Sequence, residues 1–128
     1  MIEIRTDCQP DDGALRRLWQ VAWGSDGPAS FQPVLRHGLT HLGAFDGALL
    51  VGFVNVAWDG GVHGFILDTC VDPAYRRQGI ALRLLAAAAE TARARGVQWL
   101  HVDFEPQLEA LYRQAGFRPT AAGLIRLA

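Results

Sequence analysis

The amino-acid sequence predicts an α/β fold, with a mixed and mainly antiparallel central sheet flanked by helices, in a single domain over residues 1–128. Three observations predict this class. Several extended apolar runs follow one another in the first half of the chain, and Asp46-Gly47 between two of them is a typical hairpin turn. Separate segments carry apolar residues at helical spacing. A further apolar run follows the long Ala/Leu-rich helix, so it should lie parallel to the strand before that helix.

The first elements are a strand and a helix. Residues 1–7 alternate isoleucines with charged residues, which predicts a half-buried strand. Apolar residues at helical spacing follow in "DDGALRRLWQVAWG", and Asp11 or Asp12 can cap this helix. Trp19 and Trp23 lie one turn apart on it. We expect them to bury the helix against the sheet, with a role in lining a substrate pocket as the alternative.

The stretch "DGPASFQPVLRHGLTHL" is broken by glycine and proline and predicts one short helix over residues 33–39. His37 and His41 are four residues apart, a spacing that holds a metal ion when both residues are helical. Gly38 and Thr40 disfavour such a helix, and no third ligand is near. We therefore expect no metal site here.

The rest of the chain predicts alternating strands and helices. Gly96 is expected to end the long helix as a C-terminal cap, and Pro106 suits the first turn of the last helix. The expected elements after the hairpin turn are a second hairpin arm over residues 48–58, a fourth strand over 63–71, a helix over 80–95, a fifth strand over 97–104, a helix over 106–116 and a final strand over 117–128.

Composition narrows the function. The formal net charge is -1, so neither nucleic acid nor an anionic membrane is an expected bulk partner. The chain contains two cysteines, no signal peptide and no apolar run long enough to span a bilayer, which predicts a cytoplasmic protein with free thiols. All 12 basic residues are arginine, which suggests a GC-rich bacterial genome.

The most informative stretch is "VDPAYRRQGIALRLL", where the fourth strand gives way to the long helix. Ligands of open α/β sheets bind at this end of a strand, and the unpaired amides of a helix N-terminus favour an anion. Gly79 and Ala81 leave room for close approach to the backbone, and Arg76 and Arg77 add positive charge. The stretch therefore predicts a cradle for a phosphate or pyrophosphate.

This cradle lacks the Gly-Lys-Ser/Thr ending of a Walker loop and the three glycines of a dinucleotide fingerprint. It resembles the signature of the GNAT superfamily of acyl-CoA-dependent N-acetyltransferases, Arg/Gln-x-x-Gly-x-Gly/Ala, as Arg76-Arg77-Gln78-Gly79-Ile80-Ala81. The lead-in Val71-Asp72-Pro73-Ala74-Tyr75 and the downstream "LYRQAGF" from Leu111 to Phe117 are also similar to the family. A simple helix cap is the alternative.

The resemblance implies acetyl-CoA as cosubstrate, with no metal, in a site where the fourth and fifth strands splay apart. The pantetheine arm would pair with the free edge of the fourth strand as an added strand does. The backbone groups in question belong to Thr69, Cys70 and Val71. The pyrophosphate would lie on the amides from Arg77 to Leu82, near Arg76. Family members transfer the acetyl group directly, and a thiol in an apolar strand is normally inert, so we expect no acyl-enzyme on Cys70.

The resemblance also implies catalytic residues. Tyr112 occupies the position of the acid that protonates the leaving thiolate, with a core tyrosine as the alternative. N-terminal acetyltransferases of this superfamily carry a glutamate after a Trp-Leu pair in the fifth strand, where this chain has His101. Histidine suits a base at neutral pH. Asp103, Asp68 or a water chain are the alternatives for the base.

One residue departs from the family pattern. Glu105 stands seven residues before Tyr112, where the family often has an asparagine that touches the pantetheine. Its carboxylate could fix a cationic substrate or cap the helix at Pro106. The sequence thus predicts direct acetyl transfer to an amine of a small molecule or a peptide N-terminus, in a possible homodimer. The alternative is a non-catalytic acyl-CoA-binding module of the same fold that acts through a protein partner.

Overall fold

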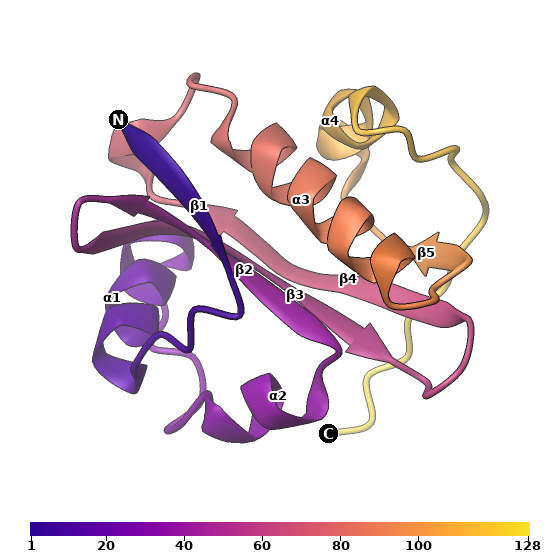
Figure 1. Cartoon of the computed structure of the whole chain (residues 1–128), viewed down its shortest axis with the longest axis horizontal. Coiled ribbons are helices and arrows are strands. Elements are labelled where there is room, and N and C mark those ends of the chain that lie inside the picture. Colours follow the sequence, from indigo (N-terminus) through magenta and orange to yellow (C-terminus); the bar gives the residue numbers. More distant parts are fainter.

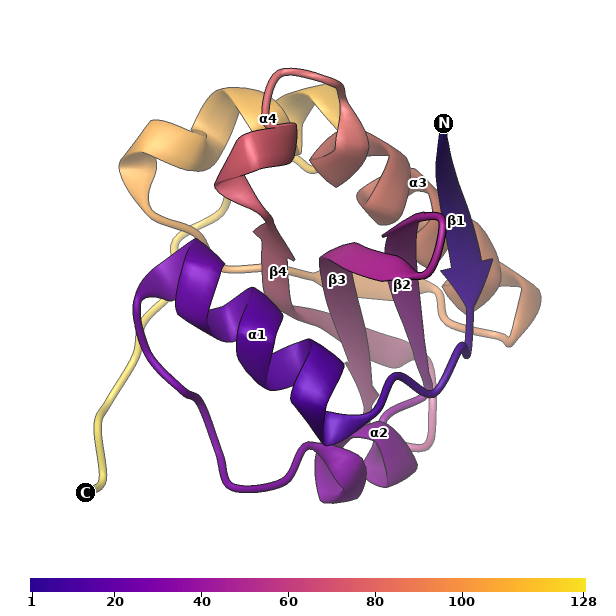
Figure 2. The same cartoon turned by 90° about the vertical axis from the view of Figure 1, so that its left-hand side faces the viewer.

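The computed structural model describes residues 1–128. Five strands form one sheet in the order β1-β2-β3-β4-β5, with α1 and α2 on one face and α3 and α4 on the other (Figure 1, Figure 2). The first three strand pairs are antiparallel and β4 pairs with β5 in parallel, as predicted. The elements are β1 (Ile2–Thr6), α1 (Asp12–Trp23), α2 (Gln32–His37), β2 (Thr40–Asp46), β3 (Leu49–Trp58), β4 (His63–Val71), the 3-10 turn η1 (Pro73–Tyr75), α3 (Ile80–Ala94), β5 (Trp99–His101), the 3-10 turn η2 (Pro106–Leu108) and α4 (Glu109–Gln114).

Each face of the sheet buries its own core. On one face, α3 contributes Leu84, Leu85 and Ala88 to a cluster with strand residues and Tyr112 of α4. On the other face, α1 packs against β3 and β4 through a cluster that includes Trp19 and the Cys70 side chain. The apolar stripes that predict these two helices are thus the surfaces that hold them to the sheet.

The start of α1 agrees with the sequence, and its aromatic pair does so in part. The Asp11 side chain accepts a hydrogen bond of 2.8 Å from the Ala14 amide, so Asp11 is the cap. Trp19 is 7% exposed and buries the helix as expected. Trp23 is 47% exposed, because it lies at the last turn, and contacts Trp19 edge-on.

The predicted short helix forms as α2 and separates the two histidines. His37 is its last residue, whereas His41 lies in β2. His41 is buried and its Nε2 accepts a hydrogen bond from the Gln9 amide at 3.0 Å. The two rings therefore do not share a helix face, and no group of three His, Cys, Asp or Glu side chains is placed to hold a metal ion.

A β-bulge interrupts β4 near its C-terminal end. Phe53 pairs with Cys70 but Asn55 pairs with Leu67, so two β4 residues stand opposite one residue of β3. Asp68 lies in this bulge with φ of 60°, an uncommon conformation for a residue with a side chain. Positions four apart share a face in a regular strand. Here Ile66 packs in the α3 core and Cys70 in the α1 core, so the bulge moves the following side chains to opposite faces.

The predicted fifth strand is shorter than expected, and the predicted final strand is wrong. Only Trp99–His101 pair with β4, opposite His63, Gly64 and Phe65, although β4 continues to Val71. The two strands diverge beyond this point, so the rest of 97–104 lacks a ladder. Residues 118–128 form no helix or strand. Pro119 lacks an amide donor and the three-residue β5 offers little edge to pair with, so the apolar side chains of this tail remain exposed.

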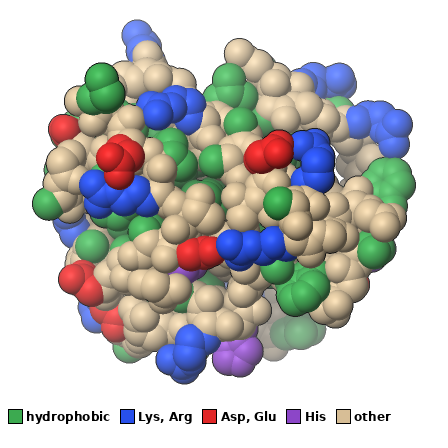
Figure 3. All heavy atoms as spheres, in the orientation of Figure 1, with side chains coloured by type: hydrophobic (Ala, Val, Ile, Leu, Met, Phe, Trp, Pro, Cys, Tyr) green, Lys and Arg blue, Asp and Glu red, His purple; other side chains and the backbone are tan.

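Acidic and basic side chains are interspersed over the face of the molecule shown in Figure 3. None of the helices combines the length and the apolar composition that a bilayer-spanning helix requires.

Candidate active site

A notch opens at the C-terminal end of β4, between the η1–α3 loop and α4. It encloses about 250 Å³ and is visible at the upper rim of the molecule in Figure 3. Pockets that bury a drug-sized ligand usually enclose about 300–1,000 Å³, so this one holds only part of a large ligand. Its lining residues are Val71, Tyr75, Arg76, Arg77, Gly79, Ile80, Ala81, Leu82, Leu111 and Gln114. Seven of the ten residues predicted for the cofactor site lie in this lining, while Thr69, Cys70 and Gln78 do not.

The backbone at the start of α3 is arranged as an open helix N-terminus. Gly79 is the N-cap with φ of 73°, and Arg77 is also left-handed with φ of 65°. No side chain caps the helix, and its first turn contains no acidic residue. A Cβ at Gly79 would meet no heavy atom within 4 Å, so packing within the protein does not require the missing side chain. The amides of this turn therefore face open space. They carry the partial positive charge of a helix N-terminus, which suits an anion.

Two side-chain contacts that the sequence analysis missed hold the loop before α3. Asp72 is buried, accepts a hydrogen bond from the Ala74 amide at 2.9 Å and pairs with the Arg17 guanidinium at 2.6 Å. The Tyr75 hydroxyl donates to the Asp46 carboxylate at 2.6 Å, from the β2–β3 hairpin. The Arg17–Asp72 and Asp46–Tyr75 contacts join residues that are far apart in the chain, so no local sequence pattern predicts them. They fix the direction from which the chain enters the notch.

The edge of β4 that faces β5 is free from the point where the two strands diverge up to Val71. Within this stretch the Thr69 hydroxyl is buried and has no hydrogen-bond partner. A buried polar group without a partner is uncommon and marks a place where a ligand can supply one. Burial, with a smaller contribution from the Asp68 carboxylate, raises the pKa of the Cys70 thiol to about 12. Cys70 is therefore a thiol at neutral pH and not a nucleophile.

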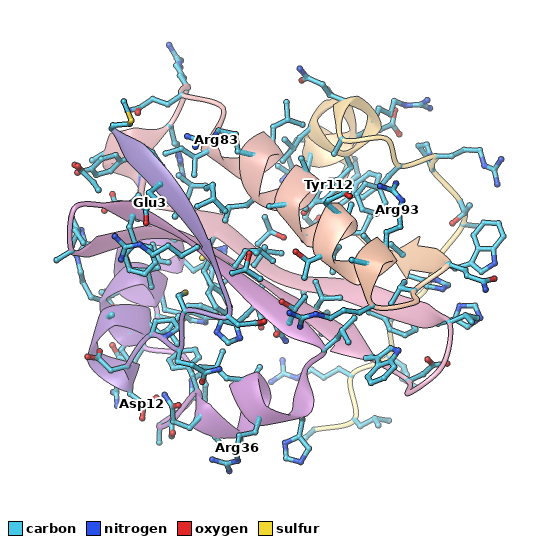
Figure 4. All side chains as sticks on the ribbon, viewed as in Figure 1. Glu3, Asp12, Arg36, Arg83, Arg93 and Tyr112 are labelled. Atoms are coloured by element: carbon cyan, nitrogen blue, oxygen red, sulfur yellow. The ribbon has the colours of Figure 1, made fainter.

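Tyr112 lies between α4 and α3 (Figure 4). It is 5% exposed, its ring stacks on Phe104 at 4.8 Å between centroids, and Phe117 contacts it edge-on at 5.8 Å. Its hydroxyl has no partner within the protein, yet only the Asn55 and Thr69 side chains have fully buried oxygens that lack one. The phenol is thus held by packing with its oxygen not fully buried, and Tyr112 itself lies outside the notch lining, which includes its neighbour Leu111. The two phenylalanines are a second feature that the sequence analysis missed.

The candidates for a base lie where β4 and β5 part. His101 is the last residue of β5, and its ring stacks on Phe65 at 4.6 Å between centroids. Its Nε2 lies 2.8 Å from Nδ1 of His63, a contact that the sequence analysis did not foresee. Packing of protein atoms around the Asp68 carboxyl in the bulge raises its pKa, although the residue as a whole remains accessible to solvent.

Two further acidic residues, Asp103 and Glu105, lie near the point where β4 and β5 diverge, and only the capping role considered for Glu105 is contradicted. Asp103 is exposed beyond the end of β5. Glu105 precedes η2 at the cap position, but its side chain makes no capping hydrogen bond. Of the two roles suggested for Glu105, the structural one is therefore wrong.

Comparison with known proteins identifies the family. The sequence profile of the Acetyltransferase (GNAT) family matches residues 2–117. The chain belongs to the GNAT acetyltransferase family. This membership confirms the resemblance that the signature at α3 indicates, and the match covers both faces of the sheet as well as the notch.

Two curated relatives of this GNAT protein are similar to parts of it. The N-alpha-acetyltransferase RimI of Mycobacterium tuberculosis (strain ATCC 25618 / H37Rv) is 38% identical over 97 residues, which cover 71% of this chain and 60% of RimI. The GCN5-related N-acetyltransferase 6, chloroplastic, of Arabidopsis thaliana is 36% identical over 64 residues, which cover 48% of this chain and 22% of that protein. The matches thus span less than two thirds of the length of either relative.

Solved GNAT structures share the fold over nearly the whole chain. The GNAT family acetyltransferase SP0256 from Streptococcus pneumoniae TIGR4 is 26% identical, with a TM-score of 0.81 and coverage of 100% of this chain and 98% of SP0256. The GNAT family N-acetyltransferase YhbS from Escherichia coli, solved in complex with CoA, is 24% identical with a TM-score of 0.76. That match covers 91% of this chain and 68% of YhbS.

Proposed function

We propose that this GNAT protein transfers the acetyl group of acetyl-CoA directly to an amine of a small molecule or of a peptide N-terminus. The observation that carries the proposal is the uncapped, left-handed start of α3 at Gly79, which opens into the notch beside the free edge of β4. The notch and this edge meet at Val71, the last residue of β4, so a long ligand with an anionic middle can lie along both. The family membership makes acyl-CoA the ligand that this path would take.

The residues along the path fit the parts of acetyl-CoA. The amides from Arg77 to Leu82 would hold the pyrophosphate, with Arg76 adding charge at the rim. The backbone of Thr69, Cys70 and Val71 would pair with the pantetheine arm, and the arm can also satisfy the Thr69 hydroxyl. YhbS, which shares the fold, was solved with CoA. When bound, acetyl-CoA supplies an activated thioester.

The chain itself supplies two functions around that thioester. An amide of the free β4 edge can donate a hydrogen bond to the oxygen that becomes negative during attack. Tyr112, with its ring fixed by packing and its hydroxyl without a partner in the protein, can donate a proton to the departing thiolate and then regain one from solvent. The raised pKa of the buried Cys70 thiol supports direct attack by the amine without an acyl-enzyme.

We assign the base to His101, acting through water. His101 pairs with Phe65, four residues before Thr69, so about 13 Å of strand separates it from the expected thioester position. A water chain along the gap between the strands can bridge this distance. Asp68 in the bulge is nearer to that position, and its raised pKa keeps it as the alternative.

The acidic residues around the gap favour a cationic acceptor. Asp68, Asp103 and Glu105 are all exposed there. A protonated amine or N-terminus would be attracted to them before it loses its proton. The 38% identity to an N-alpha-acetyltransferase supports the peptide N-terminus as one acceptor class.

The test is release of free CoA thiol from acetyl-CoA across a panel of polyamines, aminoglycosides and peptides with different N-terminal residues, with mass spectrometry of the products. Acetylated amine in equal amount to released thiol is the expected result. Tight acetyl-CoA binding without turnover on any acceptor would favour the non-catalytic acyl-CoA module.

A further inference from the structure

Two of the four histidines of the chain contact each other at the point where β4 and β5 diverge. His63 begins β4 and His101 ends β5, and the sequence separates them by 38 residues. The Nδ1 of His63 and the Nε2 of His101 are 2.8 Å apart, with ring centroids at 5.0 Å and an interplanar angle of 42°. This is a hydrogen-bond distance between two ring nitrogens.

Neighbouring groups restrict the His101 ring and the His63 backbone. Phe65 stacks on the His101 ring with an interplanar angle of 20°, which limits the rotation of that ring. The backbone of His63 is fixed by the ladder to β5 and by a hydrogen bond of 3.3 Å from its amide to the Asp59 carboxylate. The contact therefore joins two solvent-facing rings whose backbones are fixed by an ordered strand pair.

The contact restricts the protonation states of the pair. A hydrogen bond between two imidazole nitrogens needs one donor and one acceptor, so it is lost if both rings carry a full positive charge. When Nε2 of His101 donates to Nδ1 of His63, the lone pair of His101 lies on its Nδ1. That nitrogen is then free to accept a proton, and the hydrogen bond strengthens once His101 is charged.

We propose that His63 is a positioning residue for His101 in acetyl transfer, an inference that rests on the proposed function. His63 Nδ1 accepts the Nε2–H of His101 and holds His101 in the tautomer that can act as a base. The proton lost by the amine arrives on Nδ1 of His101 through water and later leaves to solvent, so His101 returns to its neutral form. No other atom is transferred to either ring.

The charge that faces the pair is acidic. It is that of Asp59 in the β3–β4 turn, whose carboxylate accepts a hydrogen bond from the His63 amide and interacts electrostatically with His63, while Asp68 and Asp103 lie farther along β4 and beyond β5. These carboxylates are the same in every variant that leaves them in place. Substitutions at His63 therefore isolate the contact between the two rings.

The test compares His63→Asn, His63→Gln and His63→Ala. An asparagine amide can reach the position of Nδ1, whereas a glutamine amide reaches that of Nε2, which makes no contact with His101. His37→Ala is the matched control, since His37 is exposed and makes a single hydrogen bond through Nδ1 to the Pro33 carbonyl at 2.7 Å. Assays contain EDTA, so that a metal ion bridging the two rings cannot contribute.

Without the acceptor, His63→Ala and His63→Gln should lower kcat at least about threefold and shift the acidic limb of its pH profile by about 0.5 toward lower pH. The KM for acetyl-CoA should stay unchanged. His63→Asn should retain most of the rate and the original limb, and His37→Ala should match the parent protein. Unaltered rate and pH profile in His63→Ala would overturn the proposal.

Imidazole ¹⁵N NMR of the free protein gives a readout that does not depend on turnover. His101 should be an Nε2–H tautomer in the parent protein and in His63→Asn, and a tautomer mixture in His63→Ala. A His101 tautomer that is unaffected by His63→Ala contradicts the proposal even if no acceptor is found. Absence of transfer by the parent protein, with the NMR result as expected, would instead reject the proposed function alone.

Discussion

Gly79 offers the sharpest perturbation of the cofactor path, and Gly24 provides its control. Both glycines are left-handed, with φ of 73° and 71°, and an added Cβ at either would meet no heavy atom within 4 Å. Gly24 is the C-cap of α1 and does not line the notch. Gly79→Val and Gly24→Val therefore impose the same backbone strain, but only Gly79→Val adds a side chain beside the first turn of α3.

The left-handed conformation costs a residue with a side chain about 1–2 kcal/mol. For a domain of this size, that corresponds to a fall in Tm of roughly 3–8 °C, which both variants should show. Only Gly79→Val should weaken acetyl-CoA binding, by at least about tenfold, equivalent to about 1.4 kcal/mol. Calorimetric titration of both folded variants below their Tm measures this difference.

Equal affinities in the two variants would show that the pyrophosphate does not lie against Gly79. A loss of affinity in both variants would mean that backbone strain alone lowers binding. It would then give no support for close approach of the pyrophosphate to the backbone at Gly79. A pyrophosphate that lies against Gly79 should give a loss of affinity in Gly79→Val together with retained affinity in Gly24→Val.

Three further predictions concern single side chains. Tyr112→Phe keeps the stacking on Phe104 but lacks the proton donor, so kcat should fall roughly 100-fold with little change in acetyl-CoA affinity. Near-normal turnover in this variant would show that Tyr112 is a core residue only. His101→Ala should remove or move the acidic limb of the pH profile of kcat/KM, which is expected in the range where imidazoles titrate, about pH 6–7. A limb that follows the pKa of the substrate amine when two amines are compared would show that His101 is not the base. Burial lowers the pKa of His41 despite the nearby Asp7 charge, so its stabilising contribution is present above pH 6.5 and is lost as the pH falls below that value. Urea denaturation at pH 7.5 and 5 should show a loss of stability that cannot exceed about 2 kcal/mol, the limit for one imidazole between pH 6.5 and 5, and His41→Gln should reduce that loss.

The sequence predicted best what depends on local chemistry. The turn at Gly47, the Asp11 cap and the glycine start of α3 each follow from the conformation or hydrogen bonding of a few adjacent residues. The notch is lined largely by the predicted residues because the strand–loop–helix connection brings consecutive residues together. The parallel pairing of β4 and β5 follows in the same way from a single helical connection.

What the sequence did not predict depends on register and on distant partners. The contact of His63 with His101 requires knowing that His63 pairs beside Trp99, and the bulge at Asp68 requires knowing the ladder to β3. The expected final strand failed for a related reason. Its apolar residues suit a strand, but they find no partner edge in the structure, and a strand forms only with one.

The central claim is that acetyl-CoA lies along the free edge of β4 with its pyrophosphate on the start of α3. A crystal structure of the protein with acetyl-CoA tests this most directly. We predict phosphate oxygens about 2.7–3.2 Å from amides between Arg77 and Leu82, and the thioester sulfur within hydrogen-bond reach of the Tyr112 hydroxyl. A pyrophosphate bound elsewhere, or a sulfur that Tyr112 cannot reach, would contradict the account.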